Sequence, residues 1–289
     1  MLTFSLLINS WFTKNRGTIL GLISAGSGFG GSVMSPVVAY IISVYGYKQS
    51  YLITSTILFI LVIPIALFIK ENPDVSVVEV KNEENISFIR KTTRQLLKEQ
   101  KVILGLTVIF LMGFLITPWL NILPSCLMDR GFDEIFASKI LAVVLFITAV
   151  SKILIGAIYD RIGIKVATNI CLISFVICSV LLLIVNSEFI AYMFAILFGI
   201  SLSSITVLLP LFTSSIVGDE YLSDIIGIAT ALIGASTALG IPVINFTYDL
   251  IGSNSIILII FIILGTFNIL LAYMALKKAE VSKHPSYTD

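Results

Sequence analysis

The 289-residue sequence has few of the side chains that enzymes and metal proteins use: one histidine and three cysteines. His284 lies in the polar C-terminal tail, which argues against histidine-based catalytic triads and nearly all metal sites. Cys171 and Cys178 are too far apart along one predicted helix to form a disulfide, and we expect them and Cys126 to be free thiols. The sequence therefore predicts a protein that is not an enzyme and has no metal and no cofactor.

Charge is also scarce. Only 12% of the residues are charged, the net charge is +1, and no run of lysine and arginine alternates with aromatic residues, so nucleic acid is not an expected partner. Hydrophobic residues make up 57% of the chain and the mean hydropathy is +1.05, which is more apolar surface than a soluble core of this size can bury. The composition predicts an all-α, polytopic membrane protein in a lipid bilayer.

Apolar runs that can cross a hydrocarbon core of roughly 30 Å as helices recur along the chain. Residues 1–12 are apolar but too short to span, and they are typical of the end of a helix whose beginning is missing. The short connections after residue 101 favour antiparallel neighbours. We predict eight full transmembrane helices, at about residues 17–44, 51–69, 102–123, 136–158, 166–184, 189–212, 225–248 and 255–276.

Residues 70–101 interrupt the apolar pattern with many charges and an Asn72-Pro73 pair, and we predict that they form a linker. Within the linker, the spacing of the apolar residues predicts a surface helix over 86–100. Most basic residues lie in the linker or in other connections that the predicted topology puts on the linker's side of the membrane. The positive-inside rule places that side in the cytoplasm. We therefore expect a multi-pass protein of the cell membrane whose linker and tail (277–289) are cytoplasmic.

An internal repeat relates the two ends of the chain. A shift of 206 positions places the span at 17–44 on the span at 225–248, and parallel copies of this kind imply two halves of six helices each. On this interpretation, 1–69 is the remnant of an N-terminal half (a stub of span 4, and spans 5 and 6), and 102–276 is a complete C-terminal half. We expect a twelve-span protein that is truncated at its N-terminus. The matched pairs are Gly21 with Gly227, Gly28 with Gly234, Pro36 with Pro242, and Gly46 with Gly252.

Small residues and prolines lie inside several spans. The segment 26–31 fits the dinucleotide-binding pattern G-x-G-x-x-G, but no strand precedes it, so we interpret its glycines as packing residues. We predict that Gly26, Gly30 and Gly234 allow close helix packing. Pro36 and Pro242 are predicted to bend their helices, which could serve a rocking motion of one half on the other.

Lys152 is the only ionisable residue well inside a predicted span. Its distance from the predicted helix end at 158 is about 9 Å, too far for easy contact with the cytoplasmic surface. Because a bare ammonium in the membrane is costly, we expect Lys152 to bind an anion. That anion is either a carried substrate in an aqueous cavity or a carboxylate of the missing helices. Thr148, one turn earlier, is a weaker candidate for the same cavity. Trp119 and Asn121 are further candidates, although packing is the commoner use of such residues.

A short charged turn separates the spans at 136–158 and 166–184. Its two glycines let the backbone segments approach each other where the chain reverses. Its charges either set the topology only, or form a latch in which the aspartate pairs with a basic residue or a helix N-terminus across the interface between the halves. The order of the residues favours the latch. They are Gly156, Asp160, Arg161, Gly163 and Lys165.

The order Gly-x-x-x-Asp-Arg-x-Gly-x-Lys in this turn, the repeat and the helix count together resemble the major facilitator superfamily over essentially the whole chain. Three further segments, 11–17, 131–138 and 248–252, resemble its oxalate/formate antiporter and monocarboxylate transporter branch. The resemblance implies the major facilitator fold without its first three spans and most of the fourth. It also implies that Lys152 contacts a substrate carboxylate, and Thr148 stands where the monocarboxylate carriers often have an aspartate. The span at 225–248 has no lysine, which makes a monocarboxylate a better candidate than a dicarboxylate.

We therefore expect the full-length form to be a monomeric secondary transporter of a small organic anion, which works by alternating access and uses a coupling ion or an exchanged anion. Residues 1–289 alone are not expected to transport, because half of the cavity wall is missing. One alternative is a facilitator-type drug exporter or neutral-solute carrier, in which Lys152 is structural. The other is a non-transporting membrane protein whose linker, 70–101, recruits a soluble partner.

Overall fold

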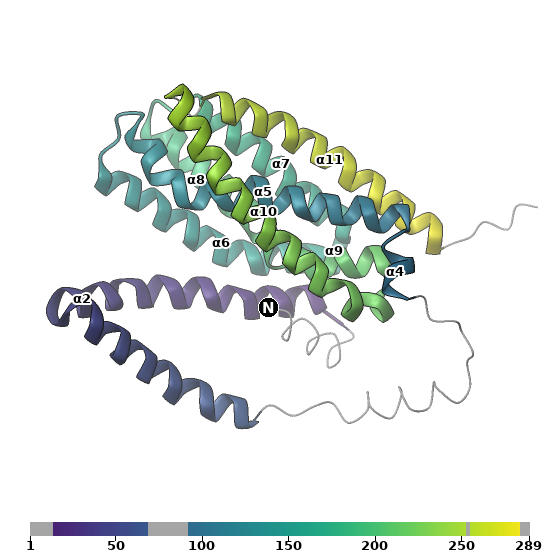
Figure 1. Ribbon diagram of the computed structural model, residues 1–289, viewed down its shortest axis with the longest axis horizontal. Coiled ribbons are helices and arrows are strands. Elements are labelled where there is room, and N and C mark those ends of the chain that lie inside the picture. Colours follow the sequence, from purple (N-terminus) through teal and green to yellow (C-terminus); the bar gives the residue numbers. More distant parts are fainter. Residues whose placement is uncertain (1–13, 69–91, 253–254, 284–289) are drawn as a thin grey trace, which may run out of the picture.

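The structure is a computed structural model that describes residues 14–68, 92–252 and 255–283, and all regular elements in these ranges are helices (Figure 1). Seven of the described helices are long and apolar enough to cross a membrane. The prediction of an all-α polytopic membrane protein is confirmed. The elements are α2 (Arg16–Phe68), α4 (Thr93–Leu96), α5 (Gln100–Met128), α6 (Glu134–Ile162), α7 (Ile164–Leu183), α8 (Glu188–Leu202), η1 (Ser203–Ile205), α9 (Leu208–Val217), η2 (Asp219–Tyr221), α10 (Leu222–Ile251) and α11 (Ser255–Lys283).

Helices α5 to α11 form one bundle. In it, α5 packs against α10 and α11, α7 packs against α8 and α11, and α6 packs against α8. Large apolar side chains fill the interior, among them the fully buried Trp119, Phe175 and Phe261, whereas Phe189 and Leu250 on the outside are about 70% exposed. Because the chain exposes such residues around its surface, the bundle has the apolar exterior that a lipid environment requires.

Helix α2 consists of two arms that meet at Gly46, the one residue in it whose backbone angles are not helical (φ 77°, ψ 167°). The first arm, residues 16–45, runs along α6, and the second arm, 47–68, turns back and stands apart from the bundle (Figure 1). Glycine adopts this positive φ at little cost, which explains a sharp turn at this position. Helices at both expected positions and the turn between them are therefore present, although among the described residues of α2 only Val44–Pro64 is one of the seven segments long and apolar enough to cross a membrane.

The two copies of the repeat end in a similar way. Gly46 ends the first arm at φ 77°, and its repeat partner Gly252 ends α10 at φ 68°. Their neighbours differ, since the first arm packs against α6 and α10 packs against α5. The division of the chain into the halves 1–69 and 102–276 stays a prediction.

The span expected as one helix at 189–212 is interrupted. Helix α8 ends at Leu202, a 3₁₀ turn follows, and α9 resumes at Leu208 and continues to Val217. Ser203 and Ser204 donate their hydroxyls to the carbonyls of Ile200 and Ser201, which competes with regular helix geometry. In addition, Pro210 has no N–H to offer the preceding turn. The expectation of a continuous helix was wrong for this physical reason.

The expected surface helix at 86–100 is also shorter than predicted. The described part of this segment begins at residue 92, and its only helix is α4, a single turn capped by a hydrogen bond from Thr92 N to Gln95 Oε1 at 2.9 Å. Residues 69–91 lie outside the described structure. At the other end, α11 continues to Lys283, so residues 277–283 of the expected tail are helical.

Candidate functional site at the interface of α2 and α6

Glycines let the first arm of α2 lie directly against the backbone of α6. A Cβ added to Gly21 would overlap the carbonyl of Lys152, and one added to Gly156 would overlap the carbonyl of Gly17. A Cβ on Gly28 would lie 2.9 Å from that of Ala149. Along this contact the numbering rises in α2 as it falls in α6, so the two helices are antiparallel.

The glycines that the sequence predicted to allow close helix packing are not the ones in this contact. Gly26 and Gly30 are exposed, and a Cβ added at either position, or at Gly234 in α10, would meet no atom within 4 Å. The expectation of close packing was wrong for these three residues in the described structure. Residues 17, 21 and 28 share the face of α2 that meets α6, whereas Gly26 and Gly30 lie on another face.

The two prolines expected to bend helices give no evidence of doing so. Pro242 lies within α10, which the structure describes as one helix from Leu222 to Ile251. Pro36 lies within the first arm of α2, but its side chain is outside the described structure. A bending role for these prolines stays a prediction.

Lys152 is 5% exposed and its ammonium lies between α6 and α2. Nζ donates to the carbonyl oxygen of Ser24 and to the hydroxyl of Ser27, both at 3.1 Å. The Ser27 hydroxyl in turn donates to the Ser24 carbonyl at 2.7 Å. Among the described residues, no carboxylate forms an ion pair with Lys152. The buried charge is therefore held by two neutral oxygens.

The other predicted binding residues do not join Lys152 in one cluster. Thr148 is buried one turn away, and its hydroxyl donates to the carbonyl of Val144 at 2.7 Å. On α5, Trp119 packs edge-on against Phe261 of α11, with ring centres 5.7 Å apart, and its indole N–H has no partner within the described ranges. Asn121 is exposed. No hydrogen bond within the described part of the chain connects Trp119 or Asn121 to Lys152.

Asp160, two turns beyond Lys152 on α6, binds the N-terminus of α2. Its carboxylate accepts hydrogen bonds from the backbone N–H of Gly17 at 2.9 Å, from that of Thr18 at 2.7 Å, and from the Thr18 hydroxyl at 2.6 Å. Because α2 begins at Arg16, these N–H groups have no partner within the helix, and the positive end of the helix dipole favours a carboxylate there. This is the geometry that the latch interpretation describes, with a helix N-terminus as the partner.

A second contact joins the same end of α2 to the turn that follows α9. Arg16 forms an ion pair with Asp219 at 2.7 Å, and Ser214 donates to the same carboxylate at 2.5 Å. We call the part of the bundle that contains Arg16, Asp160 and Asp219 the charged end. The sequence offers no local signal for this pair, because 203 positions separate Arg16 from Asp219.

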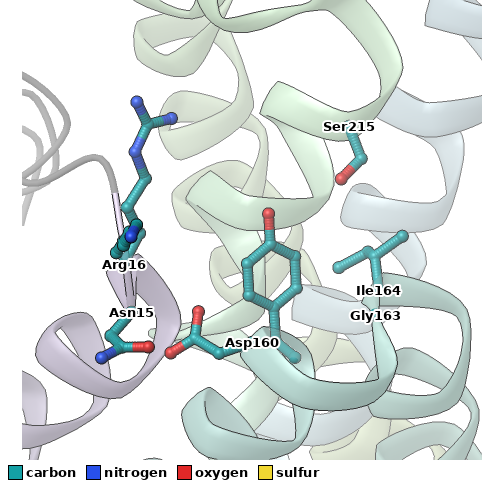
Figure 2. Close-up of a pocket in the computed structure, with 8 residues that line it drawn as sticks. Asn15, Arg16, Asp160, Gly163, Ile164 and Ser215 are labelled. Carbon is teal, nitrogen blue, oxygen red and sulfur yellow. The ribbon is translucent and has the colours of Figure 1, made fainter.

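A surface cavity of about 540 Å³ lies at the charged end. Figure 2 shows Asp160 beside the start of α2 and Ser215 on the opposite wall. Within the described residues, no three His, Cys, Asp or Glu side chains gather to form a metal site. The cavity is lined by Lys14, Asn15, Arg16, Tyr159, Asp160, Gly163, Ile164 and Ser215.

The remaining residues of the charged turn have separate positions. Gly163 is the single residue between α6 and α7, and its φ of 104° permits the immediate chain reversal. Lys165 forms an ion pair with Glu280 of α11 at 2.7 Å, in which the two side chains are 42% and 60% exposed. Arg161 is exposed at the end of α6.

We expect the Lys165→Gln variant to unfold at nearly the same temperature as the unmodified protein. An ion pair this exposed contributes at most about 1 kcal/mol, because water and salt screen it. Thermal melts of the purified protein at low and high salt measure the effect, with Glu280→Gln as the matched variant. A large loss of stability that persists at high salt would contradict this prediction.

Comparison with known proteins agrees with this fold. Residues 2–241 match the family described as Major Facilitator Superfamily. Human monocarboxylate transporter 2 is 24% identical to the chain over 270 residues, which cover 85% of this chain and 56% of that protein. The chain therefore spans little more than half the length of this relative. Because the family match includes most of the sequence and the structure is all-helical with membrane-length helices, the chain belongs to the major facilitator superfamily of membrane transporters.

Proposed function

We propose that this chain is part of a secondary transporter that carries a small monocarboxylate across the cell membrane by alternating access, as an exchanger or a co-transporter. In this proposal Lys152 binds the substrate carboxylate. The observation that carries it is the buried ammonium, whose partners among the described residues are only the Ser24 carbonyl and the Ser27 hydroxyl. A buried cation without a counter-ion is costly, so a bound anion would relieve that cost.

The substrate class is supported by the number of cations and by the relative. Among the described residues, Lys152 is the one cation that is buried at a helix interface within a membrane span. One ammonium balances one carboxylate and leaves a second carboxylate unpaired, which favours a monocarboxylate. The similar human protein is named a monocarboxylate transporter.

The same helix pair would couple substrate binding to the conformational change. Lys152 and Asp160 are about 12 Å apart along α6, and both form hydrogen bonds to the first arm of α2. Alternating access requires contacts that close one end of the cavity and later break. We propose that Asp160 at the α2 N-terminus and the pair Arg16–Asp219 close the charged end, and that this end, the linker and the C-terminus face the cytoplasm.

Replacement of Lys152 by glutamine tests the binding site. We expect the dissociation constant for radiolabelled propionate to rise about tenfold or more, since the carboxylate loses its only counter-ion. Equilibrium binding to the purified protein in lipid nanodiscs measures it. Lys139→Gln is the matched control, because Lys139 is an exposed lysine on the same helix. Equal affinities of the Lys152→Gln and unmodified proteins would refute the role of Lys152.

A further inference from the structure

Ser27 lies beside Lys152 where the first arm of α2 crosses α6. Its hydroxyl accepts a hydrogen bond from Nζ at 3.1 Å and donates its own proton to the Ser24 carbonyl at 2.7 Å. An ammonium has three protons, and these contacts use two of them, one to Ser24 and one to Ser27. The third proton is the one that a carboxylate can accept.

Helix packing fixes the position of this hydroxyl. Gly21 touches the backbone of Lys152 itself, and Gly28 contacts Ala149 one turn away, so the segment of α2 between them has a set distance from α6. Ser24 is buried in this interface, whereas Ser27 is exposed at its edge. The backbone at Ser27 therefore has a set position beside α6, and its hydroxyl remains reachable.

In the described structure, part of the surface of α2 next to Ser27 is open. Gly26 and Gly30 are both exposed, and a Cβ added at either would meet no described atom within 4 Å. A small carboxylate that reached Lys152 along the exposed edge of this interface would meet the Ser27 hydroxyl. The hydroxyl can rotate away from the Ser24 carbonyl and donate its proton to the carboxylate instead, because a serine O–H is free to turn about its C–O bond.

We propose that Ser27 determines the charge specificity of this site: its hydroxyl is the neutral second donor that completes a carboxylate site with a single cation, Lys152. This inference rests on the proposed function. With one positive charge, the site is balanced by a monocarboxylate. A dicarboxylate would require a second cation, and Ser27 occupies a position from which such a cation could reach the ligand.

The first test removes the hydroxyl. We expect Ser27→Ala to weaken binding of radiolabelled propionate about tenfold, the lower end of the usual effect of one hydrogen bond to a charged group. The assay uses the whole chain in lipid nanodiscs. The matched control is Ser55→Ala, since Ser55 lies on α2 and its hydroxyl also donates to the carbonyl three residues earlier, that of Leu52. We expect this control to bind like the unmodified protein.

The second test restores or replaces the donor. Ser27→Thr keeps a hydroxyl and should bind propionate within about twofold of the unmodified protein. Ser27→Lys adds a cation, and we expect its affinity for radiolabelled succinate to rise about tenfold, while its affinity for propionate does not rise by a comparable factor. If Ser27 served only in helix packing, its replacement by lysine would not raise the affinity for a dicarboxylate over that for a monocarboxylate. Thermal melts of each variant show that the fold is retained.

The outcomes separate this inference from the proposed function. If Ser27→Ala binds propionate as tightly as the unmodified protein while Lys152→Gln does not bind it, Ser27 has no role and the function of Lys152 stands. If Ser27→Thr binds as weakly as Ser27→Ala, or if Ser27→Lys gains no affinity for succinate, the inference is likewise overturned. If the unmodified protein binds no monocarboxylate, the proposed function and this inference both fail.

Discussion

The Gly156→Val variant is expected to lose the contact between the first arm of α2 and α6. In the structure a Cβ at this position would overlap the carbonyl of Gly17 and lie 3.0 Å from the backbone nitrogen of Thr18. Overpacking in a protein core typically costs only about 1–3 kcal/mol of stability when neighbouring side chains can move to make room. Here the obstacle is the backbone of another helix, which cannot rotate away. We therefore expect the two helices to separate.

Amide hydrogen exchange at Gly17 and Thr18 measures this separation. Both amides donate to Asp160 only while α2 lies against α6, so they lose their protection when the helices part. We expect exchange to be at least about 100-fold faster, which corresponds to a decrease of about 2.7 kcal/mol in the free energy needed to separate the two helices. Gly30→Val is the matched control, since a Cβ added there meets no described atom within 4 Å. Exchange at the rate of the unmodified protein in Gly156→Val would contradict the packing described here.

The sequence predicted the transmembrane helices well, because bilayer thickness sets the length of an apolar run. It predicted their ends less well. The span expected to end at residue 123, just before Pro124, continues as α5 to Met128, and Pro118 and Pro124 both lie inside the helix. A proline tends to end helices in water, but a membrane helix tolerates it when neighbouring helices and side chains satisfy the freed backbone groups. The break at Ser203 was missed although Ser203, Ser204 and Pro210 together could have indicated it.

The candidate site was predictable only in part. Lys152 and Asp160 are conspicuous in the sequence, because charge is rare in an apolar chain. Their partners are not, since Ser24, Ser27 and Gly17 lie more than 120 positions away and resemble other small residues of α2. The packing glycines show the same limit. Small residues line more than one face of the first arm, and the surface of α6 decides which face is used.

The Asp160→Ala variant is expected to open the charged end. The carboxylate satisfies two backbone N–H groups at the start of α2 and one hydroxyl, and a methyl group satisfies none of them. Hydrogen bonds to a charged group contribute about 1.5–3 kcal/mol each in favourable settings, and less where water reaches them. A total loss of about 2.7 kcal/mol corresponds to a 100-fold shift towards the open form. Asp160→Asn keeps an acceptor without the charge, so an intermediate effect is expected.

A cysteine at Leu211 reports this opening. Leu211 is 5% exposed and packs with Val207 and with Leu20 of α2, so a thiol at this position becomes reachable when the start of α2 moves away. The three native cysteines are buried, which keeps background labelling low. In the Leu211→Cys protein, we expect Asp160→Ala to raise the rate of labelling by a water-soluble thiol reagent about 100-fold. Arg161→Ala is the matched control, because Arg161 is the neighbouring exposed charge. If Asp160→Ala and Arg161→Ala label equally slowly, the carboxylate does not hold the charged end closed, and the turn acts on topology alone.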